Sequence, residues 1–158
     1  MPIHAMTCST IASGLHDINL LTKSLEWFCG KKGIVNCEKT TSFHGSPITL
    51  MKIKLSRSQS RMAFSRLGGI ILNSLIEDID SKLDEENRFH FRLSQFELVK
   101  GNLMQVNNNN NEEAIKIIAK IEVYPGDKPK KVLLKLLTDS LERCERRGWL
   151  NTPPEFSI

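Results

Sequence analysis

Hydrophobic residues recur along this chain with two different periods, and each period predicts one kind of secondary structure. Alternation of apolar and polar residues is typical of a strand with one wet face, as in the segment MKIKL at 51–55. Alternation or a β-tolerant composition predicts strands over residues 3–12, 34–41, 47–55, 88–93, 101–106 and 114–124. Apolar residues three and four positions apart predict long helices over residues 15–29, 56–79 and 127–146, and one helical turn over 94–99.

Glycines mark several of the expected boundaries. Gly30 and Gly33 follow the first helix and predict its end. Gly45 lies in the turn 42–46 between two strands, where a positive φ is expected. Gly68 and Gly69 fall inside the second predicted helix, and there we interpret them as a site of close packing against a neighbouring element.

Two segments are expected to be irregular. The asparagine run 107–111 predicts a solvated loop that joins strands 101–106 and 114–124 into a hairpin. The tail 149–158 is too rich in proline to continue the last helix. Its large apolar side chains are expected either to fold back onto the domain or to dock on a partner.

The order of these elements indicates one α+β domain over residues 1–148, followed by the tail 149–158. A chain of 158 residues is long enough for one well-buried core and short for two. We expect a mostly antiparallel sheet with its long helices packed on one face. The other face of the sheet is then open to solvent.

Composition narrows the function only slightly. An apolar fraction of 40% with 25% charged residues is typical of a soluble protein, and the net charge of +4 permits an acidic partner without requiring one. The four cysteines are scattered and no histidine stands at metal-ligand spacing, so we expect neither a metal nor an organic cofactor. No signal-like or membrane-spanning stretch is present, which predicts a cytoplasmic protein without a membrane partner.

Strand parity predicts a basic surface on the open face of the sheet. The basic residues of this parity are Lys52, Lys54, Arg88, His90, Arg92, Lys116 and Lys120. The acids Glu38 and Glu122 share it, and so does Tyr124. Such a face would attract phosphates, although outward positions of any half-exposed sheet are polar. Phe89 and Phe91 fall on the inward parity, so the pattern favours recognition of a nucleic-acid backbone over base stacking.

Other candidate residues lie outside the strands. Arg57, Arg61 and Arg66 begin the second long helix, where they form either a phosphate contact or an ordinary solvated face. His44 lies in an exposed turn, with no acid or nucleophile at a recognisable motif spacing. We therefore do not expect an enzyme.

Three segments carry a resemblance to a known family: FHGSPITLMKIKL at 43–55, FHFRLSQFELVKGNL at 89–103 and IKIIAKIEVYP at 115–125. Over residues 3–137 the chain resembles an archaeal family of small proteins predicted to be RNA-binding subunits or associates of the exosome. The resemblance implies an α+β fold similar to that of the large-subunit ribosomal protein that binds five-S RNA. It also implies a role in archaeal RNA metabolism.

The resemblance adds three residues to the predicted interface. The histidine-glycine turn of the family corresponds to His44 and Gly45, followed here by Ser46 where asparagine is expected. Gln95 stands where relatives are expected to carry lysine. The complete set of candidate RNA-binding residues is His44, Gly45, Lys52, Lys54, Arg57, Arg61, Arg88, Arg92, Gln95, Lys116 and Lys120.

The sequence thus favours a non-catalytic RNA-binding protein that acts in archaeal RNA processing or ribosome assembly. Its expected partner is ribosomal or other structured RNA, with the exosome or ribosomal proteins as candidate protein partners. The alternative is a protein-interaction subunit of a larger complex, in which apolar helices or the tail hold the partner and RNA contact is incidental. Salt dependence of RNA binding separates the two hypotheses.

Overall fold

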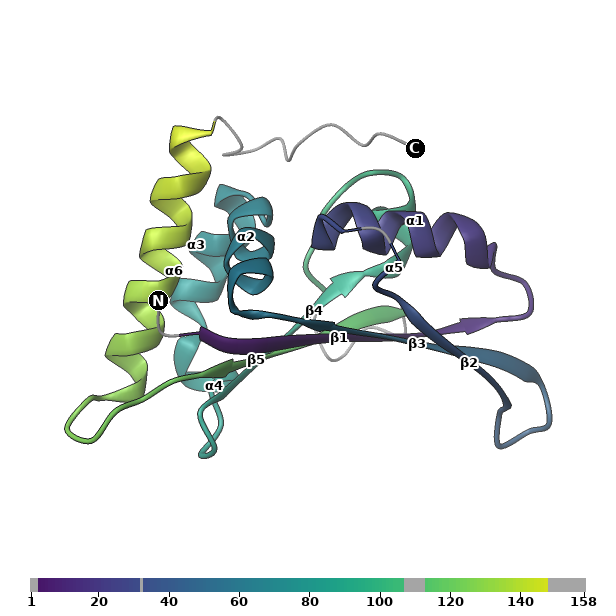
Figure 1. The fold of residues 1–158 in the computed structure, drawn as a ribbon, viewed down its shortest axis with the longest axis horizontal. Helices are drawn as coiled ribbons and strands as arrows, with labels where there is room; N and C mark the ends of the chain where they lie inside the picture. The colour runs from purple at the N-terminus through teal and green to yellow at the C-terminus, as the bar shows by residue number, and fades with distance from the viewer. Residues whose placement is uncertain (1–2, 32, 107–112, 148–158) are drawn as a thin grey trace.

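The computed structural model describes residues 3–31, 33–106 and 113–147, which form a five-stranded sheet with its longer helices on one face (Figure 1). The strands are β1 (Ile3–Ser13), β2 (Asn36–Thr41), β3 (Pro47–Leu55), β4 (Arg88–Ser94) and β5 (Ala114–Ile121). The helices are α1 (Ile18–Cys29), α2 (Arg57–Arg66), α3 (Gly69–Glu77), α4 (Ile79–Lys82), α5 (Gln95–Val99) and α6 (Pro129–Arg146).

The sheet is antiparallel throughout, with the strand order β2-β3-β1-β5-β4. Strand β1 lies at the centre of the sheet and pairs with β3 on one side and β5 on the other. Inward side chains such as Met6, Met51 and Ile117 are at most 1% exposed, because the helices cover that face. The predicted α+β fold class, with its helices on one face, is confirmed.

Local sequence signals explain where the helices begin and end. Asp17 caps α1 by accepting a hydrogen bond from the backbone N–H of Leu20, and Gly30 ends this helix with a φ of 76°. Ser56 and Gln59 form a reciprocal capping box at the start of α2. These contacts satisfy backbone groups that a helix end otherwise leaves unpaired.

The predicted helix 56–79 is broken into three pieces, α2, α3 and α4. Gly68 has φ 87° and ψ 160°, a conformation outside the helical region that glycine adopts easily. The prediction of one continuous helix was therefore wrong, whereas both glycines are buried, as close packing requires. The break lets α2 and α3 bury separate apolar stripes, including Phe64 on one helix and Leu72 on the other.

The hairpin predicted between residues 101–106 and 114–124 is also absent. Both edges of β5 are occupied by β1 and β4, so no position remains for a third partner. The segment before the asparagine run instead follows the outer edge of β4. There the backbone N–H of Ser94 donates to the carbonyl of Met104, and the backbone N–H of Val106 donates to the carbonyl of Arg92. The asparagine run and the tail 149–158 lie outside the described residues.

Aromatic side chains connect the edge strand β4 to the helix layer. The ring centroid of Phe91 lies 5.7 Å from that of Phe89 and 5.9 Å from that of Phe64 on α2. All three side chains are at most 2% exposed. This cluster holds β4 firmly, so the outward side chains of the strand have a rigid base.

Among the described helices, none is both long enough and apolar enough to cross a membrane.

Candidate nucleic-acid interface

The register of the strands builds a row of basic residues across the open face. Ser9 on β1 lies opposite Lys52 on β3 and, on its other side, opposite Lys116 on β5. Lys116 in turn lies opposite Arg92 on β4. Because paired residues of neighbouring strands point to the same side of a sheet, these side chains form one line across four strands.

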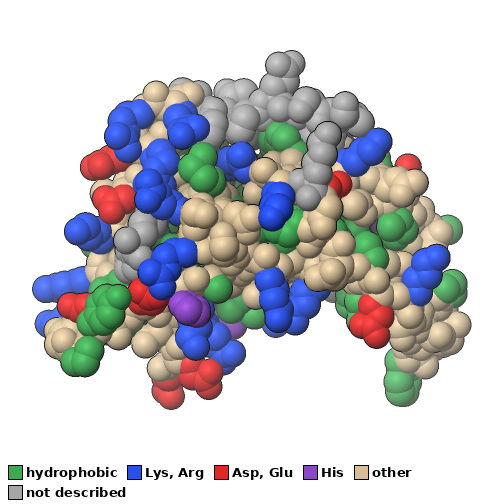
Figure 2. All heavy atoms as spheres, viewed as in Figure 1, with side chains coloured by type: hydrophobic (Ala, Val, Ile, Leu, Met, Phe, Trp, Pro, Cys, Tyr) green, Lys and Arg blue, Asp and Glu red, His purple; other side chains and the backbone are tan. Residues whose placement is uncertain are grey.

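Two further rows run parallel to this one. Lys54 and His90 lie in a row with Thr7, and Lys120 lies opposite Arg88. The prediction that Lys52, Lys54, Arg92 and Lys120 share one exposed face is confirmed. Figure 2 shows Lys and Arg side chains beneath the sheet, where the surface is hollowed between the turn before β4 and the tip of the β2–β3 hairpin.

Ion pairs divide the basic residues of this face into two groups. Arg88 contacts the carboxylates of Asp84 at 3.2 Å and Glu86 at 2.7 Å, and His90 contacts Asp84 at 2.8 Å. Five cations have no ion pair with any described carboxylate: Lys52, Lys54, Arg92, Lys116 and Lys120. We call these five residues the basic face.

Unpaired cations this close together favour an anionic ligand. Lys116 and Arg92 lie directly opposite each other on neighbouring strands, and like charges in that position destabilise a sheet. Neighbouring strands are about 4.8 Å apart, well within one Debye length at physiological salt. A chain of phosphates along the row would remove this repulsion. The hydroxyl groups of Ser9, between Lys52 and Lys116, and of Thr7, beside Lys54, can donate or accept hydrogen bonds.

Asp84 orders the edge of the interface. Partial desolvation raises the pKa of this carboxyl, but the hydrogen bond to His90, two backbone N–H donors and the Arg88 charge outweigh that effect and bring the pKa to about 2. The backbone donors belong to Glu86 and Arg88, each 2.9 Å from Asp84 Oδ1. Asp84 therefore fixes both the turn before β4 and two side chains of the exposed face.

This pKa makes the contribution of Asp84 to stability depend on pH. The folded-state pKa of about 2 is below the ordinary aspartate value, so ionised Asp84 stabilises the fold above about pH 4. That stabilisation is lost as the pH falls towards 2. We expect Asp84→Asn to lower the free energy of unfolding by about 1 kcal/mol at pH 7, a value discounted for partial exposure.

Urea unfolding at pH 7, 4 and 2.5 measures this effect. The difference between the wild type and Asp84→Asn should shrink with falling pH. Glu85→Gln is the matched control, because Glu85 is exposed in the same turn. A pH-independent difference for Asp84→Asn would mean that its carboxylate charge contributes nothing.

The turn residues His44 and Gly45 lie at the tip of the β2–β3 hairpin. Gly45 has a φ of 85°, as predicted, and donates its N–H to the carbonyl of Ser42 at 2.9 Å. The His44 ring packs edge-on against Phe43, with 5.4 Å between ring centroids. Five residues of extended strand separate Pro47 from Lys52, roughly 17 Å, so the tip flanks the basic face and is not part of it.

Gln95 is placed differently from the prediction. Its side chain is buried at 3% exposure, and its Nε2 donates to Thr10 Oγ1 at 2.7 Å and to the carbonyl of Ile11 at 3.2 Å. A buried amide with satisfied donors stabilises the core and cannot reach a ligand on the open face. Including Gln95 among the RNA-binding residues was therefore wrong.

The arginines of α2 also lie away from the centre of the face. Arg57 is exposed at the foot of the helix and pairs with Glu122. Burial, and then the nearby charge of Arg61, lower the pKa of Arg143 on α6, which places Arg61 beside that helix. Arg66 donates to the carbonyl of Phe28 at 3.2 Å and is half-buried. Arg61 and Arg66 thus lie away from the basic face, whereas Arg57 lies at its end, beside Glu122.

Sequence reasoning missed two kinds of participant. Ser9 lies between Lys52 and Lys116, and Thr7 lies beside Lys54. Strand alternation in residues 3–12 was the signal that could have identified both. Asp84 lies in the acidic turn DEEN at 84–87, which carries no motif that points to the interface. Nothing in local periodicity shows that its carboxylate reaches forward to Arg88 and His90.

Comparison with known proteins identifies a family and a shared fold. A family model described as RNA binding matches residues 6–123. No curated protein matches the chain. Among solved structures, a DUF54 protein from Methanothermobacter thermautotrophicus superposes with a TM-score of 0.69 at 19% identity, covering 89% of this chain and 99% of the other. A DUF54 protein from Archaeglobus fulgidus gives a TM-score of 0.67 at 16% identity, covering 90% and 99%.

A more distant match extends the same fold. A UPF0201 protein from Methanococcus jannaschii gives a TM-score of 0.53 at 13% identity, covering 81% of this chain and 89% of the other. At these identities the solved structures show a shared fold.

Proposed function

The chain belongs to the RNA-binding family whose model matches residues 6–123, and we propose that its basic face binds the phosphate backbone of structured RNA. The observation that carries the proposal is the set of five unpaired cations on the sheet face opposite the long helices, bordered at one edge by the short helix α4. Arg88 and His90 contribute less, because Asp84 already offsets their charge.

Recognition of backbone and shape fits this face better than recognition of splayed-out bases. The phenyl rings of Phe89 and Phe91 point into the core, so they offer no stacking platform on the sheet. Double-stranded RNA is bound through its phosphates and 2′-hydroxyl groups. The lysines supply charges for the phosphates, and the hydroxyl groups of Ser9, between Lys52 and Lys116, and of Thr7, beside Lys54, supply hydrogen-bonding groups for the 2′-hydroxyls.

Salt titration tests the proposal directly. We expect an RNA duplex of about 16 base pairs to bind with an affinity that falls steeply as salt rises, because each neutralised phosphate releases counterions. Five contacts predict a slope of about −4 in a plot of log K against log salt concentration. Fluorescence anisotropy between 50 and 300 mM KCl measures it. A slope near zero, or no binding at 50 mM, would contradict the proposal.

We further propose a non-catalytic role in archaeal RNA processing or ribosome assembly, with the exosome as a candidate partner. This finer role is supported only by the resemblance in sequence. A pull-down from native lysate, with and without RNase, tests it. Partners retained after RNase treatment are bound through protein contacts, and partners lost are tethered by RNA.

One observation favours the alternative of a protein-interaction subunit. Leu15 is 99% and Phe96 65% exposed, and both line an apolar cleft of about 560 Å³ between α1 and α5. These side chains lie outside the basic face, so substituting them separates the two functions. The double variant Leu15→Ser with Phe96→Ser should leave the affinity for duplex RNA unchanged if RNA binding is the primary activity. If the chain is instead a protein-interaction subunit, the same variant should abolish binding of the protein partner.

A further inference from the structure

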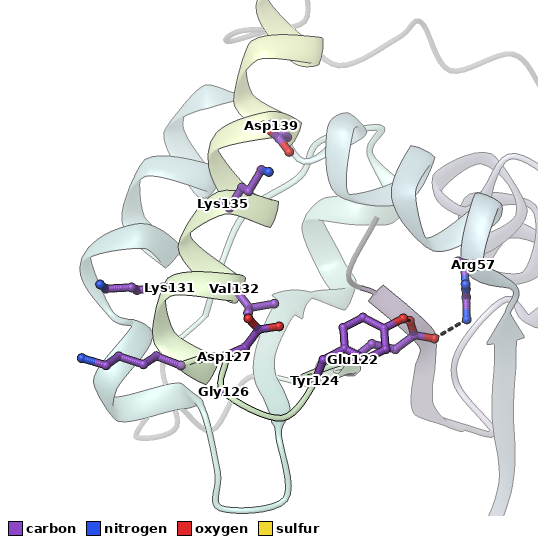
Figure 3. A pocket seen from close by; sticks show the side chains of 10 residues that line it. Arg57, Glu122, Tyr124, Gly126, Asp127, Lys131, Val132, Lys135 and Asp139 are labelled. Carbon is purple, nitrogen blue, oxygen red and sulfur yellow. Dashed lines mark hydrogen bonds and ion pairs between the residues drawn. The ribbon is translucent and has the colours of Figure 1, made fainter.

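A cleft of about 720 Å³ opens at the end of the sheet, between the foot of α6 and the start of α2 (Figure 3). Tyr124 and Glu122 form its floor, and α6 supplies one wall. Among its other lining residues are Arg57, Lys131, Lys135 and Asp139. Its volume is within the range of pockets that enclose small ligands.

Tyr124 is held in a fixed position within this cleft. Its carbonyl accepts a hydrogen bond from the N–H of Asp127 at 3.0 Å, and Gly126 has a φ of 92°. With Pro125 before it, this is the pattern of a type II turn. The phenol hydroxyl donates to Glu122 Oε2 at 3.2 Å. Both ends of the residue are therefore restrained.

Glu122 is itself anchored. Its other carboxylate oxygen, Oε1, accepts from Arg57 and lies 3.3 Å from Nδ1 of His4. The contact with His4 lowers the pKa of Glu122, and Tyr124 and Arg57 act in the same direction against partial desolvation. Figure 3 shows the Tyr124 ring between α6 and Arg57, with the Arg57 contact to Glu122 drawn as a dashed line.

In spite of these contacts the ring of Tyr124 is exposed. The residue is 65% accessible to solvent, and it is the only tyrosine of the chain. An aromatic ring that is rigid, exposed and next to cations is suited to stack on a nucleobase. Lys135 projects from α6 above it, where it can contact a phosphate, whereas Lys131 extends away from the ring.

The cleft adjoins the basic face. Tyr124 follows Lys120 by four residues, which span at most about 14 Å, and Glu122 lies between them. RNA that lies on the basic face can therefore reach the cleft with its next nucleotides. The two sites differ in charge, because the described lining of the cleft contains three carboxylates beside four cations.

We propose that this cleft binds one unpaired nucleotide of the RNA, with its base stacked on Tyr124 and its phosphate near Lys135. The proposal rests on the function proposed above and adds a specificity for duplexes that carry a single-stranded end. Because carboxylates offset much of the positive charge, binding in the cleft depends less on salt than binding on the basic face.

The test compares two RNA probes: a blunt duplex of about 16 base pairs and the same duplex with three unpaired adenosines at its 3′ end. We expect the wild type to bind the second probe about tenfold more tightly, and this advantage to persist as salt rises. Tyr124→Ala should lose the advantage while retaining affinity for the blunt duplex. Tyr124→Trp, which keeps an aromatic face, should preserve it.

Nuclear magnetic resonance provides an independent readout. In protein labelled with ring-¹³C tyrosine, all labelled ring signals belong to Tyr124, since the chain has one tyrosine. Stacking should move these signals upfield when the overhang probe is added, and the blunt duplex should leave them nearly unchanged.

The outcomes separate the two proposals. Blunt-duplex binding without any overhang advantage, or with an advantage that survives in Tyr124→Ala, overturns the nucleotide site and leaves the basic face intact. Failure of the wild type to bind either probe at 50 mM salt overturns both.

Discussion

Replacing Lys116 and Arg92 together with glutamine is expected to weaken duplex RNA binding about 30-fold at 0.15 M salt. The two side chains lie opposite each other in the basic row, and neither has an ion-pair partner among the described residues. Loss of about 1 kcal/mol for each charge-assisted phosphate contact gives this factor. Anisotropy titration measures it, and the salt slope should become shallower by about 1.5.

The matched control changes the same number of charges on the opposite layer. Lys23 belongs to α1 and Lys31 follows it, so Lys23→Gln with Lys31→Gln alters net charge equally and leaves the basic face intact. We expect this variant to bind RNA within about twofold of the wild type. Equal losses in both variants would show that net charge alone governs binding, and the basic face would then have no special role.

Phe91→Ala is expected to produce the largest loss of stability, about 3–5 kcal/mol in the free energy of unfolding. Its ring is 2% exposed and connects β4 to α2 through Phe64, so truncation leaves a cavity between sheet and helix. Urea unfolding with intrinsic fluorescence measures the change. The loss of stability also bears on the proposed function, because β4 carries Arg92 of the basic face.

Phe43→Ala is the control of the same chemistry in a different environment. Phe43 is 99% exposed at the tip of the β2–β3 hairpin, so its removal opens no cavity. We expect a change below about 0.5 kcal/mol. If the two variants proved equally stable, packing between β4 and α2 would not be what holds the edge strand.

Contacts formed in the folded protein determine which basic side chains of β4 remain without an ion-pair partner among the described residues. Arg88, His90 and Arg92 are equivalent by strand parity, but Asp84 reaches the first two and not the third. Gln95 likewise follows directly after the edge strand β4, yet the turn of α5 directs its side chain inward to Thr10. Such pairings join residues whose approach depends on turn geometry, which hydrophobic periodicity does not encode.

The pairing partners of the strands could not be predicted from local sequence either. The hairpin expected around the asparagine run had the right composition, but β5 pairs with the distant strand β1 on one side and with the preceding strand β4 on the other. Which edges meet depends on how the whole sheet buries its apolar face. The break at Gly68 shows the same limit, since a glycine pair inside an apolar helical pattern is compatible with either close packing or a chain reversal.

Features that depend on local sterics are encoded in short stretches of the sequence. Side chains alternate strictly along a strand, so Lys52 and Lys54 had to share one face of β3, and Lys116 and Lys120 one face of β5. Capping at Ser56 and the left-handed turn at Gly30 were likewise encoded within a few residues. Only the tertiary structure aligned the strands so that Lys52, Lys116 and Arg92 form one row, because register is set by pairing across the sheet and not along the chain.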